Sequence, residues 1–140
     1  MAGEQHSGGC LCGAVRYAAT GPQREVVYCH CGQCRRQSGL YYAATAVDQG
    51  NLVVADAVNL RWFAASAHAR RGFCGICGSL LFWWPEQGTH VAILAGSLDD
   101  PTSLRAGYHI CTKGRPAFYA IADGLPQYAQ SAPGLAIAPA

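Results

Sequence analysis

The sequence has few charged side chains and no long hydrophobic run. Charged residues make up 13% of its 140 residues, and the formal net charge is only +2. Because so weak a positive charge gives no field that would attract nucleic acid or an anionic membrane, we expect neither as a partner. The longest apolar runs, at residues 80–84 and 91–95, are far too short to span a bilayer.

The first nine residues also lack an apolar stretch that could serve as a secretory signal peptide. We therefore expect the chain to stay in the reducing cytoplasm, where disulfide bonds are rare. Its length corresponds to one ordinary domain. We predict a single domain over residues 1–130, followed by a loosely held tail over residues 131–140 that is rich in alanine and proline.

The residue type that the sequence does have in abundance is cysteine. Seven of its eight cysteines fall into three short clusters, namely Cys10-x-Cys12, Cys29-x-Cys31-x-x-Cys34 and Cys74-x-x-Cys77. Cysteines this close together, set among glycines, suit tight turns whose thiolates point at one ion, and zinc sites use this spacing repeatedly. A disulfide framework would also fit an even number of cysteines, but it is typical of secreted domains. The clusters therefore predict zinc binding.

The spacing alone allows more than one grouping of these ligands. A structural zinc takes four protein ligands and a catalytic zinc takes three plus water or substrate, so seven cysteines divide as four and three. In that division Cys10, Cys12, Cys74 and Cys77 close one tetrahedron, and Cys29, Cys31 and Cys34 form an open site. A zinc ribbon made of Cys31, Cys34, Cys74 and Cys77 is an alternative, although 39 residues separate its two pairs. In a third grouping, Cys111 is the fourth ligand of the middle cluster.

The apolar segments predict a mainly β fold. They are short, rich in valine, tyrosine and tryptophan, and separated by Gly, Asp, Asn or Pro. We expect strands at residues 14–18, 25–28, 40–47, 51–55, 60–64, 79–84, 90–96 and 105–110. Residues 32–38 predict a short helix, and residues 99–102 a solvated turn. Residues 48–51 predict a hairpin turn, in which Gly50 is able to take a left-handed conformation.

The basic pairs Arg35-Arg36 and Arg70-Arg71 are typical of solvated turns. Arg35 directly follows a candidate metal ligand, so it is also a candidate for pairing with a substrate carboxylate or for capping the short helix. Trp83-Trp84 continues a predicted strand, and alternation along that strand would place one ring in the core and the other outside.

Three segments of the chain carry a family resemblance. They are residues 9–17 (GCLCGAVRY), 29–39 (CHCGQCRRQSG) and 71–79 (RGFCGICGS), followed by 97–101 (SLDDP), His109-Ile110 and 123–128 (DGLPQY). In this order the segments resemble the glutathione-dependent formaldehyde-activating enzyme family, which includes the centromere protein V proteins. The resemblance covers nearly the whole chain apart from its ends.

The resemblance implies a β-tent fold of stacked antiparallel sheets with zinc knuckles and little helix. It also implies two zinc ions, a structural one on Cys10, Cys12, Cys74 and Cys77 and a catalytic one on Cys29, Cys31 and Cys34. His109 matches a family landmark, and we weigh a role beside the substrate or behind the ligands against that of a buried, hydrogen-bonded histidine. His30, between two ligands, is expected to point away from the metal as a neutral hydrogen-bond donor.

Three thiolates give a zinc site a formal charge of about −1, so it activates water less than a histidine-bound zinc but still accepts a soft sulfur ligand. A thiol held there would lose its proton and could attack an aldehyde. The resemblance names glutathione as the thiol, formaldehyde as the aldehyde and S-hydroxymethylglutathione as the product, the chemistry of a carbon–sulfur lyase. A non-catalytic zinc-binding interaction module is the alternative. Because three ligands hold a metal less tightly than four, we expect the second zinc to be lost more readily.

Overall fold

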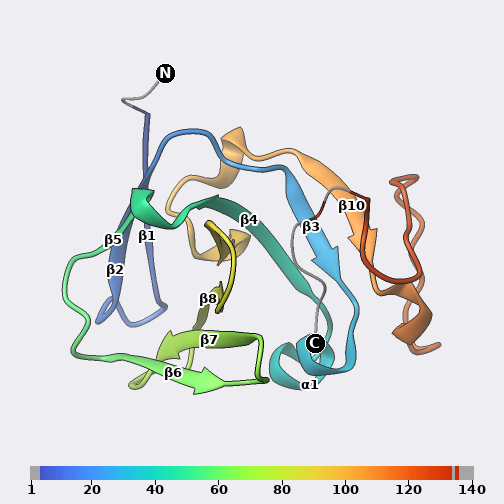
Figure 1. The fold of residues 1–140 in the computed structure, drawn as a ribbon, viewed down its shortest axis with the longest axis horizontal. Coiled ribbons are helices and arrows are strands. Elements are labelled where there is room, and N and C mark those ends of the chain that lie inside the picture. Colours follow the sequence, from blue (N-terminus) through green and yellow to red (C-terminus); the bar gives the residue numbers. More distant parts are fainter. Residues whose placement is uncertain (1–3, 134, 136–140) are drawn as a thin grey trace.

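The computed structural model describes residues 4–133 and residue 135, and in this part the chain forms ten β-strands and one α-helix (Figure 1). The strands are β1 (Gln5–Gly9), β2 (Arg16–Thr20), β3 (Val26–Cys29), β4 (Tyr42–Asp48), β5 (Leu52–Val54), β6 (Leu60–Ala64), β7 (Ala69–Cys74), β8 (Leu80–Pro85), β9 (His90–Leu94) and β10 (Ala106–Ile110). The helix is α1 (Gly32–Ser38), and four short 3-10 helices are η1 (Gln49–Asn51), η2 (Ala95–Ser97), η3 (Pro101–Ser103) and η4 (Thr112–Gly114).

The strands form two sheets. One has three strands in the order β1-β2-β5, and the other has seven in the order β10-β3-β4-β9-β8-β7-β6. All pairings are antiparallel except that of β10 with β3, which is parallel. The expected mainly β fold of stacked antiparallel sheets with little helix is therefore confirmed, with one parallel edge strand that the sequence did not indicate.

The larger hydrophobic core joins the two sheets. Tyr17 of β2 and Phe82 of β8 are both buried, and their rings meet edge to face with centroids 5.2 Å apart. Burying side chains of this size contributes about 1.5–3 kcal/mol each. A second, smaller core includes Val27, Tyr42 and Ile110 and surrounds the cysteines at the end of β3. This second core holds the elements that carry the middle cysteine cluster.

Two strands were missed from the sequence because their patterns are unusual. The strand β1 has the sequence QHSGG and no apolar side chain, so only its backbone pairing with β2 marks it. Its Gly8 lies under the ring of Tyr17, where an added Cβ atom would come within 2.4 Å of a ring carbon. The strand β7 contains two adjacent arginines, which disguise a strand that pairs on both sides.

The prediction of a hairpin turn at residues 48–51 was wrong. The strands β4 and β5 belong to different sheets, and the helix η1 carries the chain from one to the other. Gly50 does not have a positive φ, because a 3-10 helix uses right-handed dihedral angles. The turn predicted at residues 99–102 is confirmed: Asp100 accepts a hydrogen bond from the backbone N–H of Thr102 at 3.1 Å, at the start of η3.

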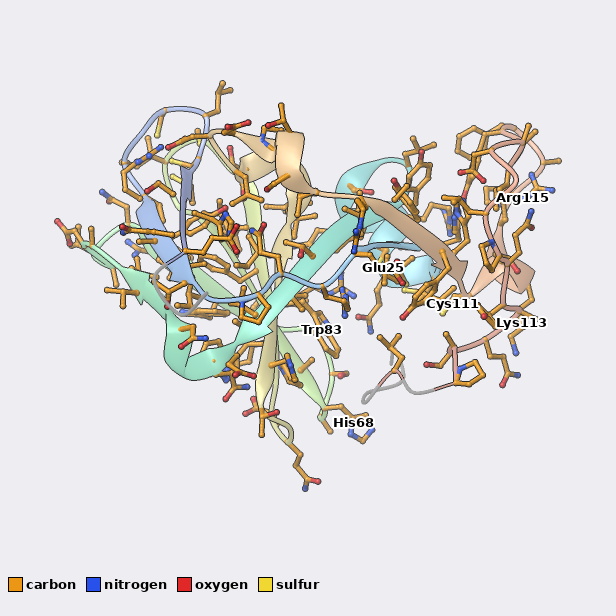
Figure 2. All side chains as sticks on the ribbon, turned by 90° about the horizontal axis from the view of Figure 1, so that it is seen from above. Glu25, His68, Trp83, Cys111, Lys113 and Arg115 are labelled. Atoms are coloured by element: carbon orange, nitrogen blue, oxygen red, sulfur yellow. The ribbon has the colours of Figure 1, made fainter. Side chains whose placement is uncertain are left out.

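The chain after β10 lies at the end of the molecule opposite the three-stranded sheet, where Figure 2 shows Cys111, Lys113 and Arg115. Within the predicted tail at 131–140, Ala132 is buried in the second core and Leu135 packs against it. Residue 134 and residues 136–140 lie outside the described residues. In the described ranges 4–133 and 135, the structure contains no helix long and apolar enough to cross a membrane.

Candidate metal centres and cavity

Cys29, Cys31 and Cys34 form a three-cysteine cluster. Their sulfur atoms all lie within 4.8 Å of one another. Cys29 ends β3, Cys31 is the N-cap of α1 and Cys34 lies in its first turn, so a strand end and a helix start bring the three together. The sulfur of Cys31 accepts a hydrogen bond from the backbone N–H of Cys34 at 3.4 Å. Hydrogen bonds from the neighbouring thiols of Cys29 and Cys34 lower the pKa of Cys31, which favours the thiolate form of this sulfur.

Arg71 of β7 is the cation beside this cluster. Its side chain is buried, and Nη1 and Nη2 lie 3.6 and 3.7 Å from the sulfur of Cys34. The same nitrogens donate to the side-chain oxygens of Gln37 and Gln33 on α1, at 3.2 and 3.1 Å. The ring of Tyr42 lies 4.7 Å from the guanidinium. Arg71 therefore offsets negative charge on the thiolates.

The prediction that Arg70-Arg71 marks a solvated turn was wrong for both residues. They lie within β7, and alternation along the strand sends their side chains to opposite faces. Arg71 reaches α1, whereas Arg70 lies 4.9 Å over the ring of Trp62 and pairs with Glu86 at 3.4 Å. The only sequence signal for Arg71 was that it opens one of the segments shared with the family.

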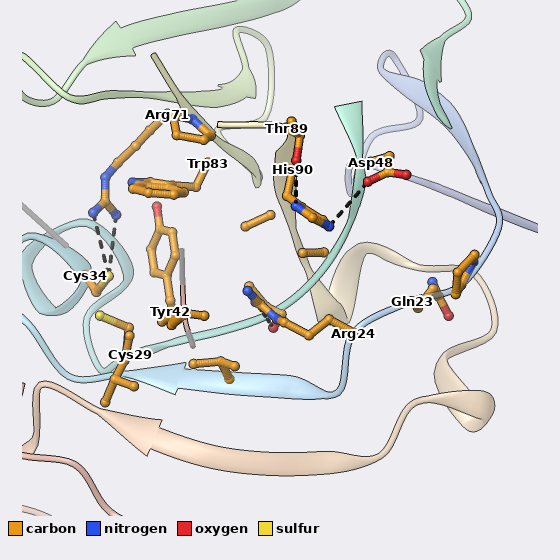
Figure 3. A pocket seen from close by; sticks show the side chains of 18 residues that line it. Gln23, Arg24, Cys29, Cys34, Tyr42, Asp48, Arg71, Trp83, Thr89 and His90 are labelled. Carbon is orange, nitrogen blue, oxygen red and sulfur yellow. Dashed lines mark hydrogen bonds and ion pairs between the residues drawn. The ribbon is translucent and has the colours of Figure 1, made fainter. Parts of the chain in front are cut away.

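A cavity of about 530 Å³ opens beside the three-cysteine cluster (Figure 3). Cys29 and Cys34 line it, so two of the three sulfurs face a space large enough for a small molecule. Figure 3 shows these cysteines on one side of the cavity and Gln23 and Asp48 on the opposite side, with Arg24 between them. Most of the remaining wall is apolar.

The two tryptophans divide as strand alternation predicts. Trp83 lines the cavity, while Trp84 packs against the larger core, its ring 6.1 Å from that of Trp62. Both are half-buried, so neither is fully inside or fully outside.

A chain of hydrogen bonds runs from His30 to the surface. His30 Nε2 lies 2.8 Å from His109 Nδ1, His109 Nε2 lies 2.8 Å from Asp123 Oδ2, and His30 Nδ1 lies 2.6 Å from the Tyr119 hydroxyl. Both imidazoles are buried, and burial lowers the pKa of His30 to about 4, so its ring is neutral. One tautomer satisfies every group: Tyr119 donates to His30, His30 to His109, and His109 to Asp123. These hydrogen bonds hold the imidazole ring of His30, the residue between Cys29 and Cys31, in one orientation.

The structure places the remaining predicted residues outside the cavity lining. His109 is buried behind His30, and Arg35 lies half-buried on α1. Cys111 follows β10 in a left-handed conformation with φ of 57°, and its sulfur does not lie within 4.8 Å of all three clustered sulfurs. A direct contact of Arg35 or His109 with substrate remains a prediction.

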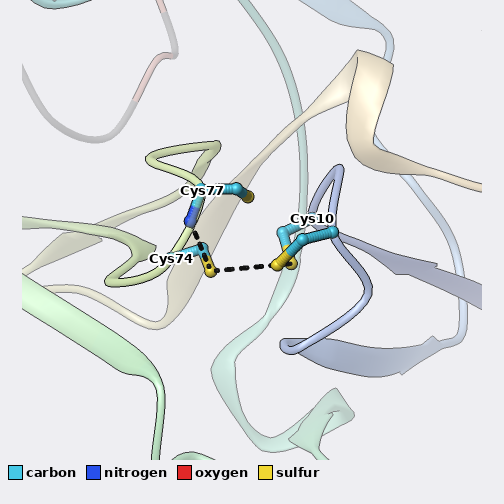
Figure 4. Close-up of side chains that lie close together, drawn as sticks. Cys10, Cys74 and Cys77 are labelled. Atoms are coloured by element: carbon cyan, nitrogen blue, oxygen red, sulfur yellow. Dashed lines mark hydrogen bonds between the residues drawn. The ribbon is translucent and has the colours of Figure 1, made fainter.

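Cys10, Cys12, Cys74 and Cys77 form a four-cysteine cluster, whose sulfur atoms also lie within 4.8 Å of one another (Figure 4). Cys10 and Cys12 come from the loop between β1 and β2, whereas Cys74 ends β7 and Cys77 lies in the turn between β7 and β8. Since these hairpins belong to different sheets, a metal bound here would cross-link the sheets. The structure thus groups the sulfurs as four and three, and does not form the zinc-ribbon grouping.

The spacing of this cluster fits a tetrahedral zinc ion. The sulfur of Cys12 lies 3.6 Å from that of Cys10 and 3.8 Å from that of Cys74. Zinc–sulfur bonds of about 2.3 Å place tetrahedral ligands about 3.8 Å apart, whereas a disulfide needs about 2 Å. The backbone N–H of Val15 donates to Cys10 at 3.2 Å, and that of Ile76 to Cys74 at 3.3 Å. At Cys10 the donor from Val15 favours the thiolate, which is the form that binds metal.

Comparisons with known proteins give three similarities. The model of the family described as glutathione-dependent formaldehyde-activating enzyme matches residues 5–114. An uncharacterized lyase of Schizosaccharomyces pombe is 30% identical over 120 residues, which cover 85% of this chain and 87% of that protein. A crystal structure of a Rhodobacter sphaeroides protein matches with a TM-score of 0.58 at 18% identity, covering 87% of this chain and 98% of that one. At that identity the crystal structure supports the fold alone.

Proposed function

Because the chain belongs to the glutathione-dependent formaldehyde-activating enzyme family, we propose that it forms or cleaves the carbon–sulfur bond of a thiol–aldehyde adduct. The lyase name of the Schizosaccharomyces pombe relative supports a lyase-type enzyme. Glutathione and formaldehyde are the substrates that the family description suggests, and S-hydroxymethylglutathione is then the adduct.

The observation that carries this proposal is the three-cysteine cluster at the cavity wall. Three sulfurs leave a zinc ion one ligand short of a tetrahedron, and two of these sulfurs line a cavity that accommodates a small molecule. The four-cysteine cluster has a full ligand set, so we assign it a structural zinc and the three-cysteine cluster the catalytic zinc. When bound there, zinc would supply a Lewis-acidic position that accepts a soft sulfur ligand and favours its thiolate form.

The chain's own residues complete the site. Arg71 holds positive charge against Cys34 and keeps a cluster of several thiolates from repelling an incoming sulfur. The apolar wall limits water around the reacting atoms. In the forward direction the substrate sulfur attacks the aldehyde carbon, a carbon–sulfur bond forms, and the carbonyl oxygen takes up the proton that the thiol released.

The test is the rate of adduct formation from glutathione and formaldehyde, measured by NMR exchange against the uncatalysed rate. We expect Cys31→Ser to lose one zinc equivalent and all catalysis. Cys111→Ser is the comparison variant: its thiol contacts Cys29 but lies outside the group of three sulfurs, so as a free thiol its loss should leave two zinc ions and the rate in place. A Cys31→Ser protein that loses one zinc yet turns over at the wild-type rate would refute the assignment.

A non-catalytic interaction module is the second candidate. Leu11 and Ile76, which flank the ligands of the four-cysteine cluster, are 89% and 65% exposed. Apolar side chains this exposed can contact a protein partner. A protein that holds two zinc ions but accelerates no thiol–aldehyde reaction, and that loses a stoichiometric partner when both residues are changed to Ser, would favour this candidate.

A further inference from the structure

Arg24 is a cation in the cavity wall without a carboxylate partner among residues 4–133 and 135. Its Nη2 donates to the backbone carbonyl of Ala44 at 3.0 Å, and its Nε makes a longer contact of 3.4 Å with the carbonyl of Glu25. Carbonyl oxygens fix the direction of the guanidinium but do not neutralise its charge. The side chain is therefore positioned and still able to receive an anion.

The surroundings of Arg24 make an anion favourable. Burial lowers the pKa of Arg24, and this loss of hydration outweighs the opposite effect of the nearby Glu25 carboxylate, which forms no ion pair with it in the part of the chain that the structure describes. Gln23 lines the same wall, and its side-chain Nε2 is buried without a hydrogen-bond partner in the part of the chain that the structure describes. An unmade bond at a buried donor costs about 1–3 kcal/mol. Figure 3 shows the Arg24 guanidinium extending toward the cysteines and Gln23 on the far side of it, so a ligand carboxylate near the cysteines can accept from Arg24.

The other charged groups that line the cavity have partners for their charge. The two terminal nitrogens of Arg71 are engaged by Cys34 and by two glutamines of α1, and only its Nε has no hydrogen-bond partner in the part of the chain that the structure describes. Asp48 lies 3.3 Å from His90, and this exposed pair is at the side of the cavity away from the cysteines (Figure 3). Arg24, between the two sides, is thus the cation that a ligand reaches once its sulfur lies at the three-cysteine cluster.

We propose that Arg24 binds a carboxylate of the thiol substrate and so makes the enzyme select carboxylate-bearing thiols over neutral ones. This inference rests on the proposed function and adds to it the residue that chooses the thiol. An arginine–carboxylate contact is charge-assisted and directional, so it also fixes the position of the substrate along the cavity.

The matched probes are N-acetylcysteine and N-acetylcysteamine, which differ by one carboxylate. Calorimetric titration of the zinc-loaded wild-type protein should show tighter binding of N-acetylcysteine by about tenfold or more, the effect of a hydrogen bond to a charged group. Arg24→Met should remove this preference by weakening N-acetylcysteine alone. Arg105→Met, an exposed arginine outside the cavity lining, is the control and should keep the preference.

Equal weakening of both probes by Arg24→Met would show a structural role and overturn the inference. If Arg24→Met does not fold, the preference of the wild-type protein between the two probes decides the question. S-Methylglutathione has no free thiol, so its binding reports on the cavity without metal ligation, and it should also weaken in Arg24→Met. Equal turnover of the two thiols would refute selection by Arg24 and leave the proposed function standing. If neither thiol is turned over, the proposed function is refuted, and the binding titrations still test the role of Arg24.

Discussion

The guanidinium of Arg71 lies against the sulfur of Cys34, with its two terminal nitrogens 3.6 and 3.7 Å away. The two residues are 37 positions apart in sequence and come from β7 and α1. With zinc bound, three thiolates would carry a net charge of about −1, and a buried charge of that kind needs a partner. Arg71 is placed to be that partner, and it connects the three-cysteine cluster to the large sheet.

Replacing Arg71 by Met should weaken metal binding at the three-cysteine cluster by about ten- to a hundredfold, the value of hydrogen bonds to a charged group. The rate of zinc release to a chromophoric chelator measures this effect. In Arg71→Met one of the two zinc equivalents should be released faster than in the wild-type protein. Arg70→Met is the matched control, because Arg70 points to the other face and contacts Trp62. If Arg71→Met holds both metals as tightly as the wild type, the charge-compensation account is wrong.

Removing the metal from the four-cysteine cluster should separate the two sheets. The cluster joins the β1–β2 hairpin to the β7–β8 hairpin, and structural zinc contributes folding free energy directly. In Cys77→Ser, hydrogen exchange should show early loss of protection in β1, β2 and β5. Unchanged protection in the three-stranded sheet would contradict the cross-link, and Cys111→Ser should behave as the wild type.

His109→Ala should destabilise the fold by about 1–3 kcal/mol, because it leaves the buried Nε2 of His30 without its acceptor. Denaturant unfolding measures the loss. Asp123→Ala removes the next partner along the chain of hydrogen bonds, but its side chain is 44% exposed, so water can replace it and the cost should be smaller. A larger loss of unfolding free energy in Asp123→Ala than in His109→Ala would contradict this account of the hydrogen bonds.

Alkaline pH should destabilise the protein through Tyr17. Burial raises the pKa of this phenol from 10.0 to about 12, so the folded state keeps a proton that the unfolded state has released. Stability is therefore complete below pH 10 and falls as the pH rises toward 12, by about 2–3 kcal/mol. Tyr17→Phe removes this group and should make the fall of the unfolding free energy over this range less steep, while Tyr42, whose pKa burial also raises to about 12, keeps its own contribution. An equally steep fall in Tyr17→Phe would assign the effect to other groups.

Local signals in the sequence were sufficient for part of the fold. The helix α1 has the predicted bounds, because the Cys-x-x-Cys knuckle starts it and Gly39, with φ of 87°, ends it. The strand β6 also has its predicted bounds. In contrast, residues 48–51 look like a hairpin turn, and only the packing of two sheets shows that the chain crosses between them.

The parts of the site that the sequence did not predict depend on contacts between distant residues. Spacing left the grouping of seven cysteines open, and the fold groups them by bringing Cys12 beside Cys74, 62 residues away. His30 and His109 are 79 residues apart, and neither histidine indicates the other in the sequence. Arg24 stood out in no motif, because its importance comes from a cavity wall that several strands build together.

The most direct test of the account is the metal content of freshly purified, reduced protein, together with the absorption spectrum of its cobalt-substituted form with and without glutathione. The account predicts two metal ions per chain and a change in the cobalt spectrum when glutathione binds at the three-cysteine cluster. A single tightly held metal, with a spectrum that does not respond to glutathione even after metal is added back, would contradict it.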